Sequence, residues 1–156
     1  MVCTGNICRS PMATGLLQNL MPADLRKITE LSSAGTHALH GQQAAAPAIQ
    51  AMIQLGFDIR QHRARQLTPE IGRRADLLVA METMHLGFIK RLHIWNRPHM
   101  RLLGEFGPNP DVPEIEDPYG GPLQAYQACI ENMRPCIDGL IQWLRTEIGG
   151  SLWGGI

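Results

Sequence analysis

The sequence predicts an α/β fold in one domain: a three-layer α/β/α arrangement around a small central parallel sheet of about four strands. Short apolar segments alternate with helical patterns, which is typical of βαβ units with right-handed crossovers. One apolar segment, residues 77–81, is continuous, as expected for a strand buried on both faces of a parallel sheet. A chain of 156 residues fits one core. We expect the domain to span residues 1–148 and a short tail to follow over 149–156.

The first half of the chain predicts two helices and a strand after an opening loop. A helix is expected over residues 11–20, because Pro11 suits the first helical position and Ser10 suits the N-cap. Residues 28–34 read as a short strand that ends in turn-forming residues. Residues 44–55 are rich in Ala and carry an apolar stripe, so they predict a helix that ends at a glycine.

The second half predicts two strands and two helices. After the strand at 77–81, residues 83–92 return to helical spacing, and residues 100–103 suit a last short strand. The prolines of residues 107–113 predict a long loop. Residues 123–148 carry apolar side chains at intervals of three and four, which predicts a long C-terminal helix. Ligands of such folds bind at the carboxyl ends of the strands, where the opening loop lies.

Composition argues against several classes of partner. Lys and Arg total 14, and Asp and Glu total 14. This balance offers no general attraction to nucleic acid or to anionic lipid. No apolar run approaches the ~20 residues that cross a bilayer, and the first residues do not resemble a signal peptide. We therefore expect a cytoplasmic protein that binds neither membrane nor nucleic acid.

The cysteine spacing argues against a metal site. The four cysteines are Cys3, Cys8, Cys129 and Cys136. Neither pair has the C-x2-C spacing of structural zinc sites, and thiols rather than disulfides are expected in a cytoplasmic protein. We therefore expect no metal.

The opening loop, residues 3–10, has the chemistry of an anion site with a nucleophile. Gly5 and Asn6 readily adopt the positive φ that lets successive backbone N–H groups point inward around a tetrahedral anion. Arg9 can bind two phosphate oxygens with its planar guanidinium, and a helix begins directly afterwards. The same donors favour the thiolate form of Cys3, and the hydroxyl of Ser10 is placed to stabilise that thiolate. The pattern indicates covalent catalysis by Cys3.

The residues from Val2 to Ala13 (Val-Cys-Thr-Gly-Asn-Ile-Cys-Arg-Ser-Pro-Met-Ala) resemble the signature of the low-molecular-weight protein tyrosine phosphatases, and the likeness extends over nearly the whole chain. The resemblance implies hydrolysis of phosphotyrosine and small aryl phosphates through a cysteinyl-phosphate intermediate, with no cofactor. Cys3 would attack phosphorus and Arg9 would bind the phosphoryl oxygens. The other residues expected to bind substrate in the loop are Thr4, Gly5, Asn6, Ile7, Cys8 and Ser10.

The family also implies roles for residues outside the loop. Asn6 would hold the loop in its strained shape through a network that matches Ser33 and His62, although each of these two could also be an ordinary turn or surface residue. Asp117 would protonate the leaving group and then activate water. By residue type alone, Glu114 and Glu116 would serve equally well.

Tyr119 would form one wall of the substrate crevice and stack on a phosphotyrosine ring. Leu39 and His40 fall where the family places the opposing wall, which is often aromatic in other members. Cys8 could trap oxidised Cys3 as a disulfide, or could simply pack within the loop. His85 and His93 are expected as exposed helix positions rather than metal ligands.

Only Met1 and Val2 precede Cys3, whereas family members carry several apolar residues there. A shortened first strand leaves an inactive phosphate-binding relic as an alternative. A second alternative is a thioredoxin-coupled arsenate reductase, which shares the fold but needs two further cysteines in the middle of the chain. Residues 79–85 contain none. The chain looks bacterial, so the family leads us to expect a monomer that acts on a phosphotyrosine protein, such as a tyrosine autokinase of exopolysaccharide export.

Overall fold

Four short parallel strands form the centre of the computed structural model, which describes residues 1–94 and 99–153. The strands are β1 (Val2–Cys3), β2 (Ala34–Gly35), β3 (Leu77–Ala80) and β4 (His99–Leu102). They are arranged in the order β2-β1-β3-β4, and every pairing is parallel. The predicted small parallel sheet is therefore confirmed.

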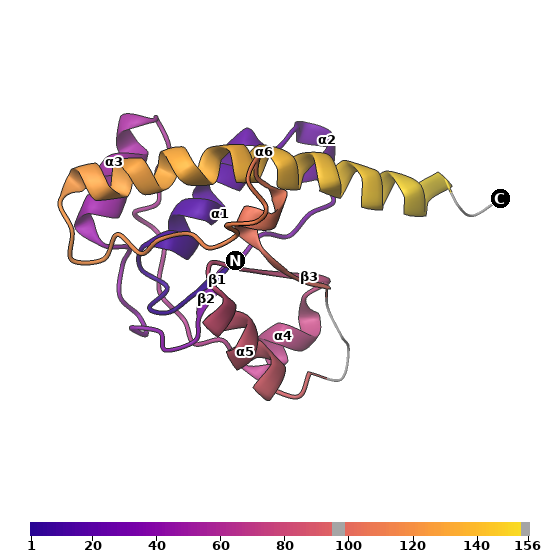
Figure 1. Ribbon diagram of the computed structural model, residues 1–156, viewed down its shortest axis with the longest axis horizontal. Coiled ribbons are helices and arrows are strands. Elements are labelled where there is room, and N and C mark those ends of the chain that lie inside the picture. Colours follow the sequence, from indigo (N-terminus) through magenta and orange to yellow (C-terminus); the bar gives the residue numbers. More distant parts are fainter. Residues whose placement is uncertain (95–98, 154–156) are drawn as a thin grey trace.

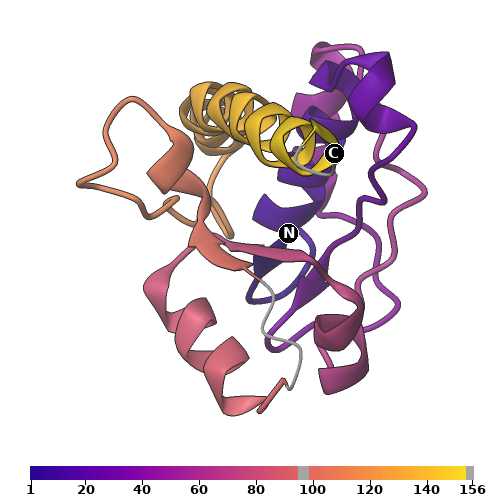
Figure 2. The ribbon, with the colours of Figure 1, turned by 90° about the vertical axis from the view of Figure 1, so that its right-hand side faces the viewer.

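Helices cover both faces of this sheet (Figure 1). They are α1 (Arg9–Leu20), α2 (Ala23–Arg26), α3 (Ala46–Gln54), α4 (Pro69–Arg74), α5 (Thr83–Arg91) and α6 (Leu123–Trp153), with a short 3₁₀ helix η1 (Leu103–Phe106) after β4. Figure 2 shows α1, α3 and α6 on one side of the sheet and α4 and α5 on the other. The predicted three layers are confirmed.

Two apolar clusters reflect the alternation of side chains along the strands. Val79 packs with α1, α3 and α6, whereas Leu78 and Ala80 pack with α4 and α5. In β1, Val2 joins the second cluster and Cys3 the first. Because successive side chains of a strand point to opposite faces, Cys3 is directed toward the side of the sheet on which α1 lies.

Strand β1 is as short as the sequence suggested. It pairs through Val2 and Cys3 only, and a pocket of about 780 Å³ lies at its amino end, between residues 28–34, β3 and α6. None of the phosphate-loop residues from Cys3 to Ser10 lines this pocket. Strand β1 therefore holds the phosphate loop at its carboxyl end, away from this pocket.

Several predictions about element boundaries were wrong. Residues 28–33 are not a strand, and β2 consists of Ala34–Gly35 alone, because β1 offers only two residues for pairing. Helix α1 begins at Arg9, so Ser10 is not its N-cap; the hydroxyl of Ser10 instead bonds within the loop that precedes the helix. Helices α2, α4 and η1 were not predicted, although Thr68 and Pro69 carry the cap signal of α4.

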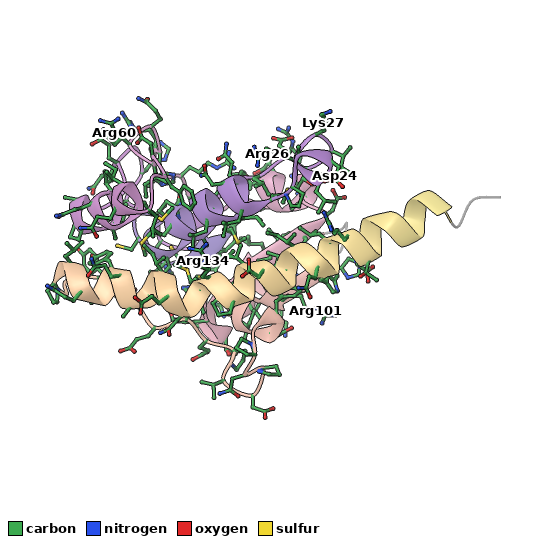
Figure 3. All side chains as sticks on the ribbon, turned by 90° about the horizontal axis from the view of Figure 1, so that it is seen from above. Asp24, Arg26, Lys27, Arg60, Arg101 and Arg134 are labelled. Carbon is green, nitrogen blue, oxygen red and sulfur yellow. The ribbon has the colours of Figure 1, made fainter. Side chains whose placement is uncertain are left out.

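Helix α6 is the longest element and runs across the whole molecule (Figure 3). It continues to Trp153, past residue 148, where the sequence pattern predicted the end of the helix. Charged side chains of both signs project from the surface of the molecule, among them Asp24, Arg26 and Arg60, which matches the formal net charge of zero. In the described residues, no helix has both the length and the hydropathy needed to cross a membrane.

Candidate active site

The loop between β1 and α1 is a ring of backbone N–H groups. Its carbonyl oxygens accept hydrogen bonds from the surrounding scaffold, whereas in the described part of the chain no hydrogen bond takes up the backbone N–H groups of residues 4–8. The carbonyl acceptors and their donors are Cys3 with Thr36 N, Thr4 with His37 N, Gly5 with Leu39 N, and Ile7 with Ala45 N, at 2.7 to 3.0 Å. Successive unpaired N–H groups of this kind bind anions.

The close approach of β2 helps to set this shape. A Cβ at position 35 would collide with the carbonyl oxygen of Thr4, so only glycine fits there. Gly35 N–H and C=O bond to Arg65 and Leu67, respectively, so β2 is held against the following loop. The phosphate loop is thereby backed by rigid structure.

Cys3 is 3% exposed, and its Sγ lies 3.0 Å from Oγ of Ser10. Ser10 Oγ also accepts a hydrogen bond from Asn6 Nδ2 at 2.8 Å. Because Ser10 Oγ acts as the acceptor toward Asn6, its own hydroxyl hydrogen stays available to donate to the sulfur. The geometry suits a hydroxyl that stabilises negative charge on Cys3.

Asn6 is at the centre of the predicted support network. Its φ is 57°, in the left-handed region, and its Nδ2 donates to Ser33 Oγ at 2.9 Å as well as to Ser10. Its Oδ1 accepts from the backbone N–H of Arg65 at 2.9 Å. His62 Nε2 donates to the Asn6 carbonyl at 2.6 Å, and burial lowers the pKa of His62, which favours the neutral ring. The structure therefore brings Ser33 and His62 to the loop.

Arg9 is 1% exposed and makes three polar contacts around the site. Its Nη1 donates to Glu82 Oε2 at 2.6 Å and to the Ile115 carbonyl at 2.9 Å, and its Nη2 donates to Asp117 Oδ2 at 2.7 Å. Its Nε is buried and has no acceptor among the described residues. A phosphate oxygen is an acceptor of the kind that this N–H group requires.

Asp117 is the acidic residue of its loop that lies at Arg9. Its side chain is 41% exposed, and Oδ1 accepts a hydrogen bond from Tyr119 N at 3.2 Å. Glu114 instead accepts from the backbone N–H of Thr83 at 2.7 Å, and this bond lowers the pKa of Glu114. Among Asp117, Glu114 and Glu116, only Asp117 has a described contact with Arg9.

The predicted crevice walls lie at the surface. Tyr119 is 66% exposed and is tied to Asp117, while Leu39 is 39% exposed and donates its N–H to Gly5. His40 follows Leu39 and is exposed, but within the described residues no hydrogen bond joins it to the loop. Tyr119 and Leu39 are thus available to a substrate side chain.

Cys8 is buried, and its Sγ contacts the hydroxyl of Tyr126 on α6 at 3.6 Å. Burial raises the pKa of Cys8 to about 11 and that of Cys129 to about 12, and it also raises the pKa of Cys136. All four cysteines are free thiols. Across residues 1–94 and 99–153, no cluster of His, Cys, Asp and Glu could hold a metal ion.

Two residues of the site were missed in the sequence. Glu82 bonds to Arg9, and His85 Nε2 lies 2.8 Å from Thr4 Oγ1. The prediction that His85 is exposed was wrong, since it is 0% exposed. His93 is exposed as expected, but it lies after the end of α5 and not on a helix. A positional signal was available, because Glu82 and His85 follow the buried strand β3, whose carboxyl end lies beside that of β1.

Comparison with known proteins identifies the family. Residues 1–149 match the model of the low molecular weight phosphotyrosine protein phosphatases. The chain is 35% identical to the probable low molecular weight protein-tyrosine-phosphatase EpsP of Ralstonia nicotianae, over 93% of this chain and 94% of the relative.

Solved structures agree with the sequence relatives. The tyrosine phosphatase Wzb from Escherichia coli K30, in complex with sulphate, superposes with a TM-score of 0.81 at 32% identity, covering 92% of this chain and 94% of Wzb. The YwlE arginine phosphatase from Geobacillus stearothermophilus also gives a TM-score of 0.81, at 35% identity, covering 94% of this chain and 91% of YwlE. The chain belongs to the low-molecular-weight protein tyrosine phosphatase family.

Proposed function

We propose that this protein hydrolyses phosphotyrosine through a covalent phosphate ester on Cys3. One observation carries the proposal: the sulfur of Cys3 lies at the start of a loop whose N–H groups at residues 4–8 have no protein acceptor in the described chain, and Arg9 connects that loop to Asp117. A nucleophile, a phosphate cradle and an acid are thereby supplied together.

In the first step, the Cys3 thiolate attacks phosphorus and the bond from phosphorus to the tyrosine oxygen breaks. The loop N–H groups and the guanidinium of Arg9 bind the three remaining phosphoryl oxygens. Protonated Asp117 gives its proton to the departing phenolate oxygen, so that tyrosine leaves as a neutral phenol. The products of this step are tyrosine and the Cys3 phosphate ester.

In the second step, water attacks the phosphorus of the ester and the bond from phosphorus to sulfur breaks. The Asp117 carboxylate, ionised by the first step, takes a proton from that water. The hydroxyl of Ser10, 3.0 Å from Sγ, stabilises the thiolate as it leaves. Inorganic phosphate is released, and Cys3 and Asp117 regain their starting states.

Substrate selection follows from the residues at the rim. The Tyr119 ring can stack on the substrate's aromatic ring, with Leu39 as an aliphatic wall opposite. We place the protein in the cytoplasm as a monomer, and its substrate would be a phosphotyrosine protein such as a bacterial tyrosine autokinase of exopolysaccharide export. A single domain over residues 1–148 remains a prediction.

The experiment compares the protein with Cys3→Ser, using Cys136→Ser as the matched control. Cys136 is a buried thiol on α6 whose Sγ bonds to the Asn132 carbonyl, a bond that serine can keep. The substrates are p-nitrophenyl phosphate and two peptides, one with phosphotyrosine and one with phosphoarginine, assayed in the presence of a metal chelator. Because a relative is an arginine phosphatase, the second peptide tests the leaving group.

We expect turnover of the aryl phosphates, a loss on the order of 10⁴-fold or more in Cys3→Ser, and little change in Cys136→Ser. Activity that survives Cys3→Ser would refute the covalent mechanism. Turnover of phosphoarginine without phosphotyrosine would refute the substrate assignment.

A further inference from the structure

The start of α5 holds the phosphate loop at both of its ends. Near the carboxyl end of the loop, Glu82 Oε2 accepts from Arg9 Nη1 at 2.6 Å. Near the amino end, His85 Nε2 lies 2.8 Å from Thr4 Oγ1. Residues 82 and 85 are about one helical turn apart, so the start of α5 contacts both ends of the loop.

The backbone fixes which nitrogen of His85 carries the hydrogen. The Glu82 N–H donates to His85 Nδ1 at 3.1 Å, so Nδ1 is an acceptor. In a neutral ring the hydrogen is then on Nε2, which donates to the Thr4 hydroxyl. His85 is 0% exposed, and burial, followed by the nearby charge of Arg9, lowers its pKa, which favours this neutral form.

The segment that contains Glu82 and His85 is itself anchored to β1, the strand that carries the phosphate loop. Strand β3 pairs with β1 through Ala80 and Val2, and Met81 N donates to the Val2 carbonyl at 3.1 Å. Glu82 follows immediately. Both ends of the phosphate loop are therefore held by contacts to a segment that is anchored to a neighbouring strand of the same sheet. These contacts add to the covalent connections of the loop to β1 and α1.

We propose that Glu82 and His85 form a clamp that sets the separation of Thr4 and Arg9, and with it the shape of the ring of N–H groups that binds phosphate. The inference rests on the proposed function, and it assigns a positioning role to two residues that need not touch substrate. A ring that opens by a fraction of an ångström binds the ground state and the transition state less well to a similar extent, so KM rises more than kcat falls.

The test is a double-mutant cycle between the two sides of one hydrogen bond. His85→Asn keeps an acceptor at the position of Nδ1 but loses the donor to Thr4, and Thr4→Val removes the acceptor. We expect each variant to lower kcat/KM and the affinity for inorganic phosphate by roughly 10-fold, and the double variant to lose no more than the worse single variant. His85→Gln, which keeps an N–H donor of similar reach, should recover part of the loss. The matched control is His93→Asn, an exposed histidine with a φ of 48°, which asparagine tolerates.

Phosphate affinity, measured by calorimetry on the folded protein, separates the clamp from a general role in folding. A residue that only supports folding would lower the melting temperature and leave the phosphate affinity of the folded fraction unchanged. Effects of His85→Asn and Thr4→Val that multiply in the double variant, or a loss in His93→Asn as large as in His85→Asn, would overturn the clamp.

A measurement on the unaltered protein covers the case in which a variant does not fold. Nitrogen-15 NMR of the imidazole rings should show His85 neutral, with its hydrogen on Nε2, and an imidazolium or a hydrogen on Nδ1 at neutral pH would overturn the clamp. Phosphate binding and the tautomer are measured without turnover, so an enzyme that failed every phosphatase assay would refute the proposed function and still leave the clamp to be decided by these results.

Discussion

The phosphate loop and the loop of Asp117 approach the same guanidinium but are built in opposite ways. Asn6 and Ser10 are 0% exposed, and each makes side-chain hydrogen bonds with other parts of the site. Asp117 is 41% exposed, and apart from its bond to Arg9 its carboxylate accepts only a bond from Tyr119 two residues later, among the described residues. The nucleophile side is fixed by the fold, whereas the acid side is held mainly by one ion pair.

Arg9 therefore serves two functions from one position, because it holds the acid and binds phosphate. It holds Asp117 at 2.7 Å, and its Nε has no acceptor among the described residues. When a phosphate group enters the ring, the guanidinium gains oxygen acceptors beside the carboxylate. The acid is therefore already at the site where the leaving oxygen arrives.

The largest effect that tests the comparison is expected for Asp117→Asn. The amide cannot give a proton to the leaving oxygen, so kcat should fall by roughly 10² to 10⁴-fold. The fall should be greater with phenyl phosphate than with p-nitrophenyl phosphate, because p-nitrophenolate needs less help to leave. Steady-state kinetics with both substrates provides the measurement.

Glu116→Gln is the control for Asp117→Asn, one residue away and without a described contact to Arg9. It should leave kcat within about 2-fold of the starting value. A loss in Glu116→Gln equal to that in Asp117→Asn, or equal losses with the two leaving groups, would contradict the assignment of the acid.

A smaller effect on activity, together with a loss of stability, is expected for Asn6→Ala on the other side of the comparison. The change removes the bonds to Ser10, Ser33 and Arg65, and places alanine at a φ of 57°, which itself costs about 1–2 kcal/mol. Misplacement of the ring should lower kcat/KM by roughly 10 to 100-fold. Kinetics and thermal unfolding measure the two parts.

The matched control is Asn19→Ala, at an exposed position of α1 where, among the described residues, the side chain bonds only to the Gly15 carbonyl one turn earlier. It should change neither activity nor melting temperature appreciably, since alanine favours the helix. If Asn6→Ala behaved like Asn19→Ala, the phosphate loop would not be fixed by its side chains.

The smallest effect concerns the buried thiol of Cys129, outside the phosphate loop, and its contribution to the pH dependence of the free energy of unfolding. Burial raises the pKa of Cys129 from 9.0 to about 12, so the folded state disfavours its thiolate. The unfolded thiol ionises near pH 9, so this contribution to the free energy of unfolding is complete below pH 9 and is lost as the pH rises toward 12. Urea unfolding at about pH 8 and about pH 10 should show a smaller decrease in Cys129→Ala than in the unaltered protein. Identical decreases would show that Cys129 does not contribute.

Much of the fold could be predicted because local patterns specify it. The continuous apolar run at 77–81 and the spacing of residues 123–148 were sufficient for β3 and for most of α6. Strand β2 was predicted too long because its length depends on its partner, and β1 pairs with two residues only. Helix α4 was missed because six residues carry too little periodicity, despite the cap at Thr68.

The site could be predicted where its residues are consecutive. Cys3, Asn6, Arg9 and Ser10 lie within eight positions, so their chemistry is visible as a motif, and the family resemblance pointed to Ser33, His62 and Asp117. Glu82 and His85 could not be read in this way, because their roles depend on the pairing of β3 with β1. A buried histidine after a strand looks in sequence like a surface histidine on a helix.

The central claim is that Cys3 forms a bond to phosphorus, and the most direct measurement is to trap that ester. The protein is mixed with p-nitrophenyl phosphate, quenched in acid within the first turnover and digested, and its peptides are analysed by mass spectrometry. The account predicts phosphate on the sulfur of Cys3, and no phosphopeptide in Cys3→Ala treated in the same way. Phosphate on another residue, or turnover without any covalent phosphoprotein, would contradict it.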